Sequence, residues 1–99
     1  MNVRKKSEDE LIAIVSTGRN AIARAKAASA LGFMGAKKAV PVLIDALGDR
    51  HALVRMLAAQ SLGRLGAKRA LAALKSASKL AVDEPYRVTF REAIRACSK

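Results

Sequence analysis

The sequence predicts an all-α fold in which about three antiparallel helix pairs stack along one axis, with no sheet. Three observations support this prediction. A segment of about 31 residues repeats along the chain, and apolar residues recur within it at helical spacing. Apolar residues make up 52% of the 99 residues, yet only Phe33, Tyr86 and Phe90 are aromatic. Alanine-rich chains with few aromatic residues favour closely packed helices over a β-sandwich or barrel.

The repeat is clearest when Arg24 is aligned with Arg55. In this register "GAKKAV" (residues 35–40) meets "GAKRAL" (residues 66–71). Both ends of the chain continue the pattern with a period that is longer by a single position. A two-helix unit cannot bury its apolar stripe alone, so neighbouring units are expected to share one core.

These units divide a single expected domain, residues 1–99, into a partial first unit, two full units and a final single helix. The expected bounds are 1–17, 20–48, 50–81 and 84–98. The apolar stripe of the helix at the centre of the stack contains Leu62. We therefore expect Leu62 to lie between neighbouring units and to be buried.

Six helices are expected, at residues 8–17, 20–34, 37–47, 50–65, 68–81 and 84–98. The first follows Ser7, which forms with Glu10 the Ser-x-x-Glu pattern of a capping box. The second begins at Asn20, a favoured N-cap residue, and ends before Gly35, which can adopt the backbone conformation that closes a helix.

The remaining four helices are marked by the same kinds of residue. The third has Pro41 in its first turn, where the missing N–H of proline costs least. The fourth is expected to take Asp49 as its N-cap and to end before Gly66. The fifth begins just after that glycine. The sixth begins beside Asp83, a candidate N-cap, and has Pro85 in its first turn.

This pattern resembles the HEAT-repeat family, particularly its short form, the phycobilisome-lyase HEAT-like repeats. The resemblance rests on "IARAKAASALGFMGAKKAVPVLIDALGD" and the matching "LVRMLAAQSLGRLGAKRALAAL", and it covers nearly the whole chain. It implies an α-solenoid in which the first helix of each pair lines the outer face and the second helix lines the inner face. It implies little about function, because one fold serves many functions.

The resemblance also implies a structural role for the arginine at the position of Arg55. In HEAT repeats this arginine pairs with an aspartate in the preceding turn, here Asp49, and such pairs build a ladder along the stack. The chain departs from that pattern at two places. The spacing from Asp83 to Arg87 is two residues shorter, and the turn before Arg24 offers glycine in place of the acid.

The charge of the chain indicates an acidic or polyanionic partner. Nineteen Lys and Arg residues against eight Asp and Glu residues give a net charge of +11. Three basic pairs occupy equivalent positions at the expected starts of the second helices, where the helix dipole disfavours cations. We name this set the basic edge: Lys5, Lys6, Lys37, Lys38, Lys68 and Arg69. An anion bound there would offset the unfavourable interaction of these cations with the helix dipoles. The equal alternative is that the pairs are only solvated residues at helix starts, copied when the repeat was duplicated.

A secondary basic surface is expected on the last two helices. Lys75 and Lys79 lie four residues apart on the fifth helix. Arg87, Arg91 and Arg95 form a stripe at four-residue spacing on the sixth helix, which Lys99 continues. Binding and a soluble cap on the open end of the solenoid are the two interpretations, and the cap is favoured.

No motif indicates catalysis, a metal or a cofactor. His51 is the only histidine and has no partner at the spacing of a zinc site. No serine stands beside a base, and no glycine-rich phosphate loop is present. Phe33 and Tyr86 are too few to form a platform for stacking bases.

Targeting signals are also missing from the sequence. Cys97 is the single cysteine and cannot form a disulfide within the chain, which is typical of a reduced compartment. The first ten residues contain no apolar signal region, and no apolar run approaches the ~18 residues of a membrane span. We expect a cytoplasmic protein that is a monomer or a weak dimer.

The sequence therefore predicts a non-catalytic scaffold that binds an acidic protein surface through the basic edge. The first alternative is binding to the phosphate backbone of nucleic acid without sequence specificity. A role as a lyase or lyase subunit, by family association, comes third.

Overall fold

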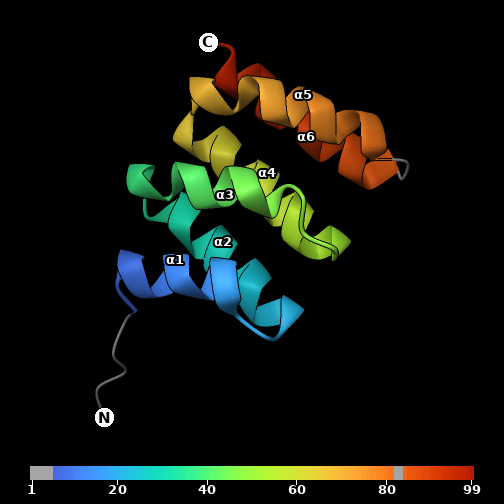
Figure 1. The fold of residues 1–99 in the computed structure, drawn as a ribbon. Coiled ribbons are helices and arrows are strands. Elements are labelled where there is room, and N and C mark those ends of the chain that lie inside the picture. Colours follow the sequence, from blue (N-terminus) through green and yellow to red (C-terminus); the bar gives the residue numbers. More distant parts are fainter. Residues whose placement is uncertain (1–5, 82–83) are drawn as a thin grey trace.

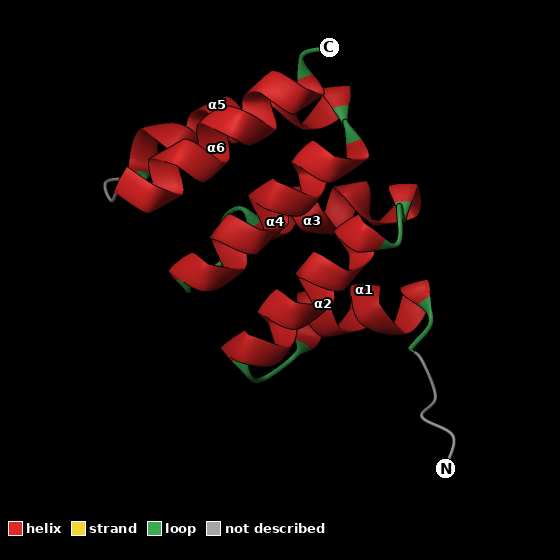
Figure 2. Cartoon of the chain, turned by 180° about the vertical axis from the view of Figure 1, so that it is seen from behind, coloured by secondary structure: helices red, strands yellow, loops and turns green. Residues whose placement is uncertain are grey.

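The computed structural model describes residues 6–81 and 84–99, in which it contains six α-helices and no strand (Figure 1, Figure 2). The helices are α1 (Glu8–Thr17), α2 (Ala21–Phe33), α3 (Val40–Ala46), α4 (Ala52–Leu65), α5 (Leu71–Leu80) and α6 (Glu84–Cys97). The 3-10 turns η1 (Lys37–Ala39) and η2 (Lys68–Ala70) lead directly into α3 and α5. The predicted all-α fold is confirmed.

The helices form two layers. In one layer α4 packs between α2 and α6, while α1, α3 and α5 form the other (Figure 1). Consecutive helices pack in pairs, α1 with α2, α3 with α4 and α5 with α6. In the second layer α3 packs on α1, but its contact with α5 is sparse. The predicted α-solenoid is therefore present, and its second layer is more open between α3 and α5.

Equivalent leucines of neighbouring units form the centre of the core. Leu62 is fully buried, as predicted, and so is Leu31 at the equivalent position of α2. In the second layer Leu43 and Leu74 are likewise fully buried. The members of each pair are separated by one repeat period, so the register of the sequence repeat is also the register of the packing.

Small residues allow neighbouring helices of the first layer to approach closely. A Cβ atom at Gly32 on α2 would overlap the side chain of Ser61 on α4. Ser61 is buried, and its hydroxyl donates a hydrogen bond to the carbonyl oxygen of Ala28 at 2.6 Å. A similar hydrogen bond joins α6 to α4, because the thiol of Cys97 donates to the carbonyl oxygen of Leu62 at 3.3 Å. Side-chain hydrogen bonds to backbone carbonyl oxygens thus connect α4 to α2 and α6 to α4.

Capping residues act as predicted at the first two helices. Ser7 and Glu10 form a capping box in which each side chain accepts a backbone N–H at 3.1 Å. The side chain of Asn20 accepts the first free N–H groups of α2. Gly35 and Gly66 have φ angles of +67° and +60°, which a residue with a Cβ rarely adopts. These glycines turn the chain from the first layer into the second.

Three predicted helix starts are wrong. The fifth helix, expected from residue 68, begins at Leu71, because residues 68–70 form the 3-10 turn η2. The third helix begins at Val40, because residues 37–39 form a 3-10 turn. No capping side chain stands before that turn, and the N–H groups of Ala39 and Val40 bond to the carbonyl oxygens three residues earlier. Asp49 is not the N-cap of α4. His51 occupies that position, and the Asp49 carboxylate accepts the His51 backbone N–H at 2.9 Å. Asp83 lies outside the described residues.

Candidate functional site

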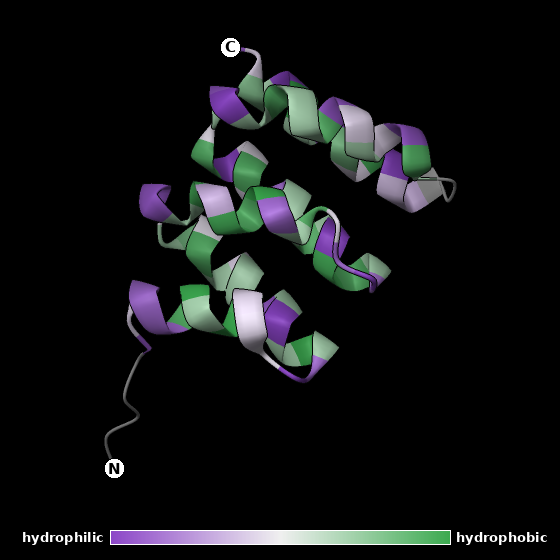
Figure 3. Cartoon of the chain, in the orientation of Figure 1, coloured by the Kyte–Doolittle hydropathy of each residue, from purple (hydrophilic) through white to green (hydrophobic). Residues whose placement is uncertain are grey.

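The basic edge lies at one end of α3 and α5. Lys37 and Lys38 form η1 and Lys68 and Arg69 form η2, so both pairs precede their α-helices instead of occupying the first α-helical turn. All four side chains are exposed. Figure 3 shows the hydrophilic starts of α1, α3 and α5 one above another along the same side of the molecule. Lys6 is exposed as well, and Lys5 lies outside the described residues.

One cation of the edge has an acidic partner. The Lys38 ammonium lies 2.9 Å from a carboxylate oxygen of Asp9 in the first turn of α1. The hydrogen bond and the charge of Asp9 raise the pKa of Lys38. Asp9 is one of the acidic residues in the first turn of α1, where a negative charge favours the helix. The structure shows a second use, as the counter-ion of the next unit.

The second unit has no equivalent acid. Asp9 aligns with Pro41 in the repeat, so no carboxylate stands at that position for the pair in η2. Lys37, Lys68 and Arg69 form no ion pair with another described residue. These three cations of the edge therefore have no counter-ion among residues 6–81 and 84–99, and their charge is available to a partner.

Apolar and aromatic groups lie beside the basic edge. Phe33, at the end of α2, is 68% exposed, and Met34 next to it is 47% exposed. The guanidinium of Arg64, in the last turn of α4, lies 3.9 Å above the centroid of the Phe33 ring. Sequence reasoning set Phe33 aside for want of further aromatic residues. The sequence repeat could have predicted this contact. Phe33 and Arg64 occupy equivalent positions of successive units, so the two side chains stack on each other.

The arginine ladder exists, but its pairing differs from the expected one. Arg24 binds the Asp49 carboxylate through two hydrogen bonds, of 2.9 and 3.2 Å, although Asp49 lies in the turn of the following unit. Arg55, the expected partner, donates instead to the backbone oxygen of Asp49 at 2.7 Å. Arg24 and Arg87 donate in the same way to the carbonyl oxygens of Gly18 and Ala81. Each arginine thus ties its helix to the carbonyl six residues earlier, a structural role that does not require an acid.

The Arg24–Asp49 pair is largely shielded from water. The side chains of Arg24 and Asp49 are 7% and 13% exposed. Burial alone would raise the pKa of Asp49, but the hydrogen bonds from Arg24 and from the His51 N–H outweigh it and hold the pKa below the ordinary value. Asp49 is therefore ionised and fully engaged within the fold.

The secondary basic surface is only partly brought together. Lys79 on α5 meets Arg87 and Arg91 on α6, and these three line a shallow hollow with Ser78 and Ile94. Lys75 and Arg95 are exposed but do not line this hollow.

Residues 6–81 and 84–99 contain neither a candidate metal cluster nor a candidate membrane-spanning helix. No three His, Cys, Asp or Glu residues described there lie close enough together to hold a metal ion. No helix described there is long and apolar enough to cross a membrane.

Comparison with known proteins identifies the fold family. Residues 8–97 match the sequence profile of HEAT repeats. The chain belongs to the HEAT-repeat family. HEAT repeats generally mediate protein interactions and are generally non-catalytic. The comparison of this HEAT-repeat chain with curated proteins found no match.

Proposed function

We propose that this HEAT-repeat chain is a non-catalytic interaction scaffold that binds an acidic surface of a protein partner. The binding residues are those of the basic edge, Lys5, Lys6, Lys37, Lys38, Lys68 and Arg69. Phe33, Met34 and Arg64 extend this surface with apolar and aromatic contacts.

One observation carries the proposal: an exposed Phe33–Arg64 stack stands at the same end of the helices as the cations without counter-ions. Phenylalanine, methionine and arginine are enriched at the centres of protein interfaces, where a few such residues provide most of the binding energy. Cations around them favour an acidic partner and accelerate association.

Binding to the phosphate backbone of nucleic acid is the alternative, favoured by the net charge of +11. The position of Arg64 weighs against it. The guanidinium covers one face of the Phe33 ring, so that face is not free to stack on a base. Phosphate contacts alone also carry no sequence specificity.

Further details belong to the same proposal. The short period of the repeat supports assignment to the phycobilisome-lyase form of the family. We assign the repeat units to residues 1–17, 20–48, 50–81 and 84–98. The single cysteine supports a cytoplasmic location. The secondary basic surface serves as the polar face that solubilises the last helix pair.

A charge-reversal variant tests the basic edge. Lys37, Lys38, Lys68 and Arg69 are replaced together by Glu, and the proteins captured by wild type and variant from a nuclease-treated lysate are identified by mass spectrometry. Wild type should capture acidic proteins that the variant does not retain. The matched control replaces Lys75, Lys79, Arg91 and Arg95 by Glu, which changes the net charge equally on another surface and should retain capture. Equal loss in both variants would show that net charge, and not the edge, drives binding.

Phe33→Ser separates the two candidate functions. The substitution should weaken binding to a captured acidic protein while leaving the affinity for a random labelled DNA duplex unchanged. Fluorescence anisotropy across a salt series measures both. If the duplex is the tighter ligand and log affinity falls with log salt at a slope of about −0.9 per phosphate contacted, nucleic acid is the partner.

A further inference from the structure

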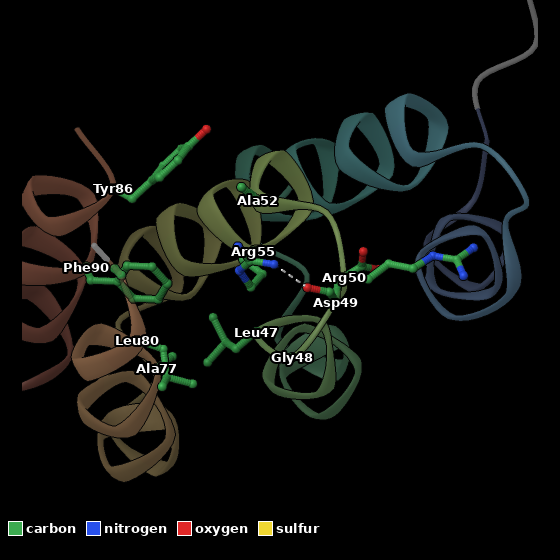
Figure 4. A pocket seen from close by; sticks show the side chains of 11 residues that line it. Leu47, Gly48, Asp49, Arg50, Ala52, Arg55, Ala77, Leu80, Tyr86 and Phe90 are labelled. Atoms are coloured by element: carbon green, nitrogen blue, oxygen red, sulfur yellow. Dashed lines mark hydrogen bonds between the residues drawn. The ribbon is translucent and has the colours of Figure 1, made fainter. Parts of the chain in front are cut away.

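A second hollow lies at the opposite end of α3 and α5 from the basic edge (Figure 4). Its volume is about 300 Å³, and it opens where α3 and α5 separate. Apolar side chains form most of its wall: Leu47, Ala77, Leu80, Tyr86 and Phe90. The volume lies at the lower limit of small ligand pockets, which suits one side chain better than a large cofactor.

The rim of the hollow exposes apolar surface to water. Leu80 is 82% exposed, the largest exposed fraction of any large apolar side chain that the structure describes. Phe90, which is 2% exposed, belongs to the core and faces the hollow from α6 (Figure 4). Covering an exposed leucine with another apolar side chain is favourable, because both surfaces leave water. The wall therefore suits an apolar group.

Two arginines are among the described residues that line the hollow, and their side chains differ in direction. Arg55 lines the hollow, and Figure 4 shows its hydrogen bond directed toward Asp49, whereas Arg50 extends away from the hollow toward α1. One nitrogen of the Arg55 guanidinium donates to the Asp49 backbone oxygen. The Asp49 carboxylate is held by Arg24 and by the N–H of His51, and Arg55 forms no ion pair with any described residue. The remaining N–H groups of Arg55 are suited to a carboxylate.

We propose that this hollow is a second docking site, which takes one apolar side chain of an acidic peptide segment and binds a neighbouring carboxylate through Arg55. Charge complementarity assigns the occupant: an apolar wall beside one uncompensated guanidinium matches an apolar residue flanked by Asp or Glu. The site is separate from the basic edge, because the two surfaces lie at opposite ends of α3 and α5. A positively charged protein attracts acidic segments in general. The hollow would add selectivity for those acidic segments that carry an apolar side chain.

A labelled peptide tests the requirement for an apolar anchor. The probe is fluorescein-labelled Gly-Glu-Glu-Leu-Glu-Glu-Gly, and the reference peptide has glycine in place of leucine. Fluorescence anisotropy should show that the leucine peptide binds about tenfold more tightly, as expected for burial of one leucine. Replacing its four glutamates by glutamine should abolish binding. Equal affinities of the leucine and glycine peptides would overturn the proposal.

Substitutions locate the site on the protein. Leu80→Ser should remove most of the leucine preference without affecting the fold, because the side chain is exposed; Leu53→Ser, at a leucine 40% exposed on α4, is the matched control. Arg55→Gln should weaken the leucine peptide about tenfold, whereas Arg91→Gln should not. An unchanged leucine preference in Leu80→Ser excludes this hollow.

Two further measurements separate this proposal from its competitors. The charge-reversed basic-edge variant should keep the ratio of affinities between the leucine and glycine peptides even if both bind more weakly. Loss of that ratio would place the peptide on the edge and overturn the second site. Octanoate should displace the leucine peptide poorly; displacement at equal affinity would assign the hollow to small apolar acids and overturn the peptide assignment.

Discussion

The two junctions between stacked units differ, although the sequence repeats between them. At the first junction Asp49 accepts Arg24 from the unit before it, and Asp9 accepts Lys38 from the unit after it. At the second junction the equivalent cations, Arg55 and Arg69, have no carboxylate among the described residues. The first junction is closed over α1 and α3, while α3 and α5 diverge at the second.

The difference shows which part of a repeat carries structure and which part is available for binding. The arginine-to-carbonyl hydrogen bond recurs in all three turns, because it needs only backbone oxygen as the acceptor. The ion pairs with carboxylates are not repeated among residues 6–81 and 84–99. Where they occur, two units are tied together by charge, and where they do not, arginine and lysine remain available to a partner.

The largest expected effect comes from the helix that both junctions share. Leu62→Ala should lower the free energy of unfolding by about 2–5 kcal/mol, because the side chain is fully buried and leaves a cavity. Urea denaturation measures the loss. Leu53→Ala, on the exposed side of the same helix, should cost far less. Similar values for the two variants would contradict the central position of Leu62.

Two glycines distinguish the packing of the junctions. Gly32→Ala should destabilise the protein by about 1–3 kcal/mol, because its Cβ would overlap Ser61 at the first junction. A Cβ at Gly63 would lie 3.1 Å from the Cα of Ala93 at the second junction, a contact that a small shift of α6 relieves. Gly63→Ala should therefore cost less, since the better helix propensity of alanine offsets part of the strain. A larger loss of stability in Gly63→Ala than in Gly32→Ala would mean that the second junction is packed more tightly than the first.

Acid should weaken the first junction. The folded pKa of Asp49 is lowered, so its contribution to stability is present above the unfolded pKa of about 3.9 and is lost as pH falls through the lower folded value. Asp49→Asn should cost about 1–2 kcal/mol at pH 7 and flatten the dependence of stability on pH in that acid range. Thermal melts from pH 2 to pH 7 compare the variant with wild type. Parallel curves would mean that Asp49 gains nothing from Arg24.

The smallest effect belongs to the exposed ion pair. Lys38→Ala should change the melting temperature slightly at low salt and not at high salt, because the Lys38–Asp9 pair is solvent-exposed and screened. Arg69→Ala, at the equivalent position without an acid, should show no loss of melting temperature at low salt, because no attractive ion pair is removed. A salt-independent loss in Lys38→Ala would indicate a packing role for the lysine stem.

Local patterns predicted the helices and their register well. Leu31 and Leu62 stand at one repeat position and are buried alike, and the capping box of Ser7 forms as its spacing indicates. Such features depend on residues within one turn or one repeat period. The 3-10 form of η1 was not predicted, since it depends on how the N–H groups are satisfied where no capping side chain stands.

Contacts between units were harder to predict. The resemblance to HEAT repeats assigned Asp49 to Arg55, yet Arg24 reaches the Asp49 carboxylate from 25 residues away. That choice is set by the rotation of one unit on the next, which periodicity does not report. Phe33 under Arg64 has the same origin, although their equivalent positions in the repeat contained the clue. The role of the basic edge in binding stays a prediction.

The buried thiol at the interface of α6 with α4 can report when this interface opens, because a thiol reacts with reagents in solution only when it is exposed. Cys97 is fully buried, burial raises the pKa of its thiol, and its hydrogen bond to Leu62 closes it off further. An alkylating reagent can react only after the end of α6 that carries Cys97 opens away from α4. Labelling kinetics without any engineered probe would therefore measure the opening of this end of α6, and would show whether a ligand bound beside Phe90 slows that opening.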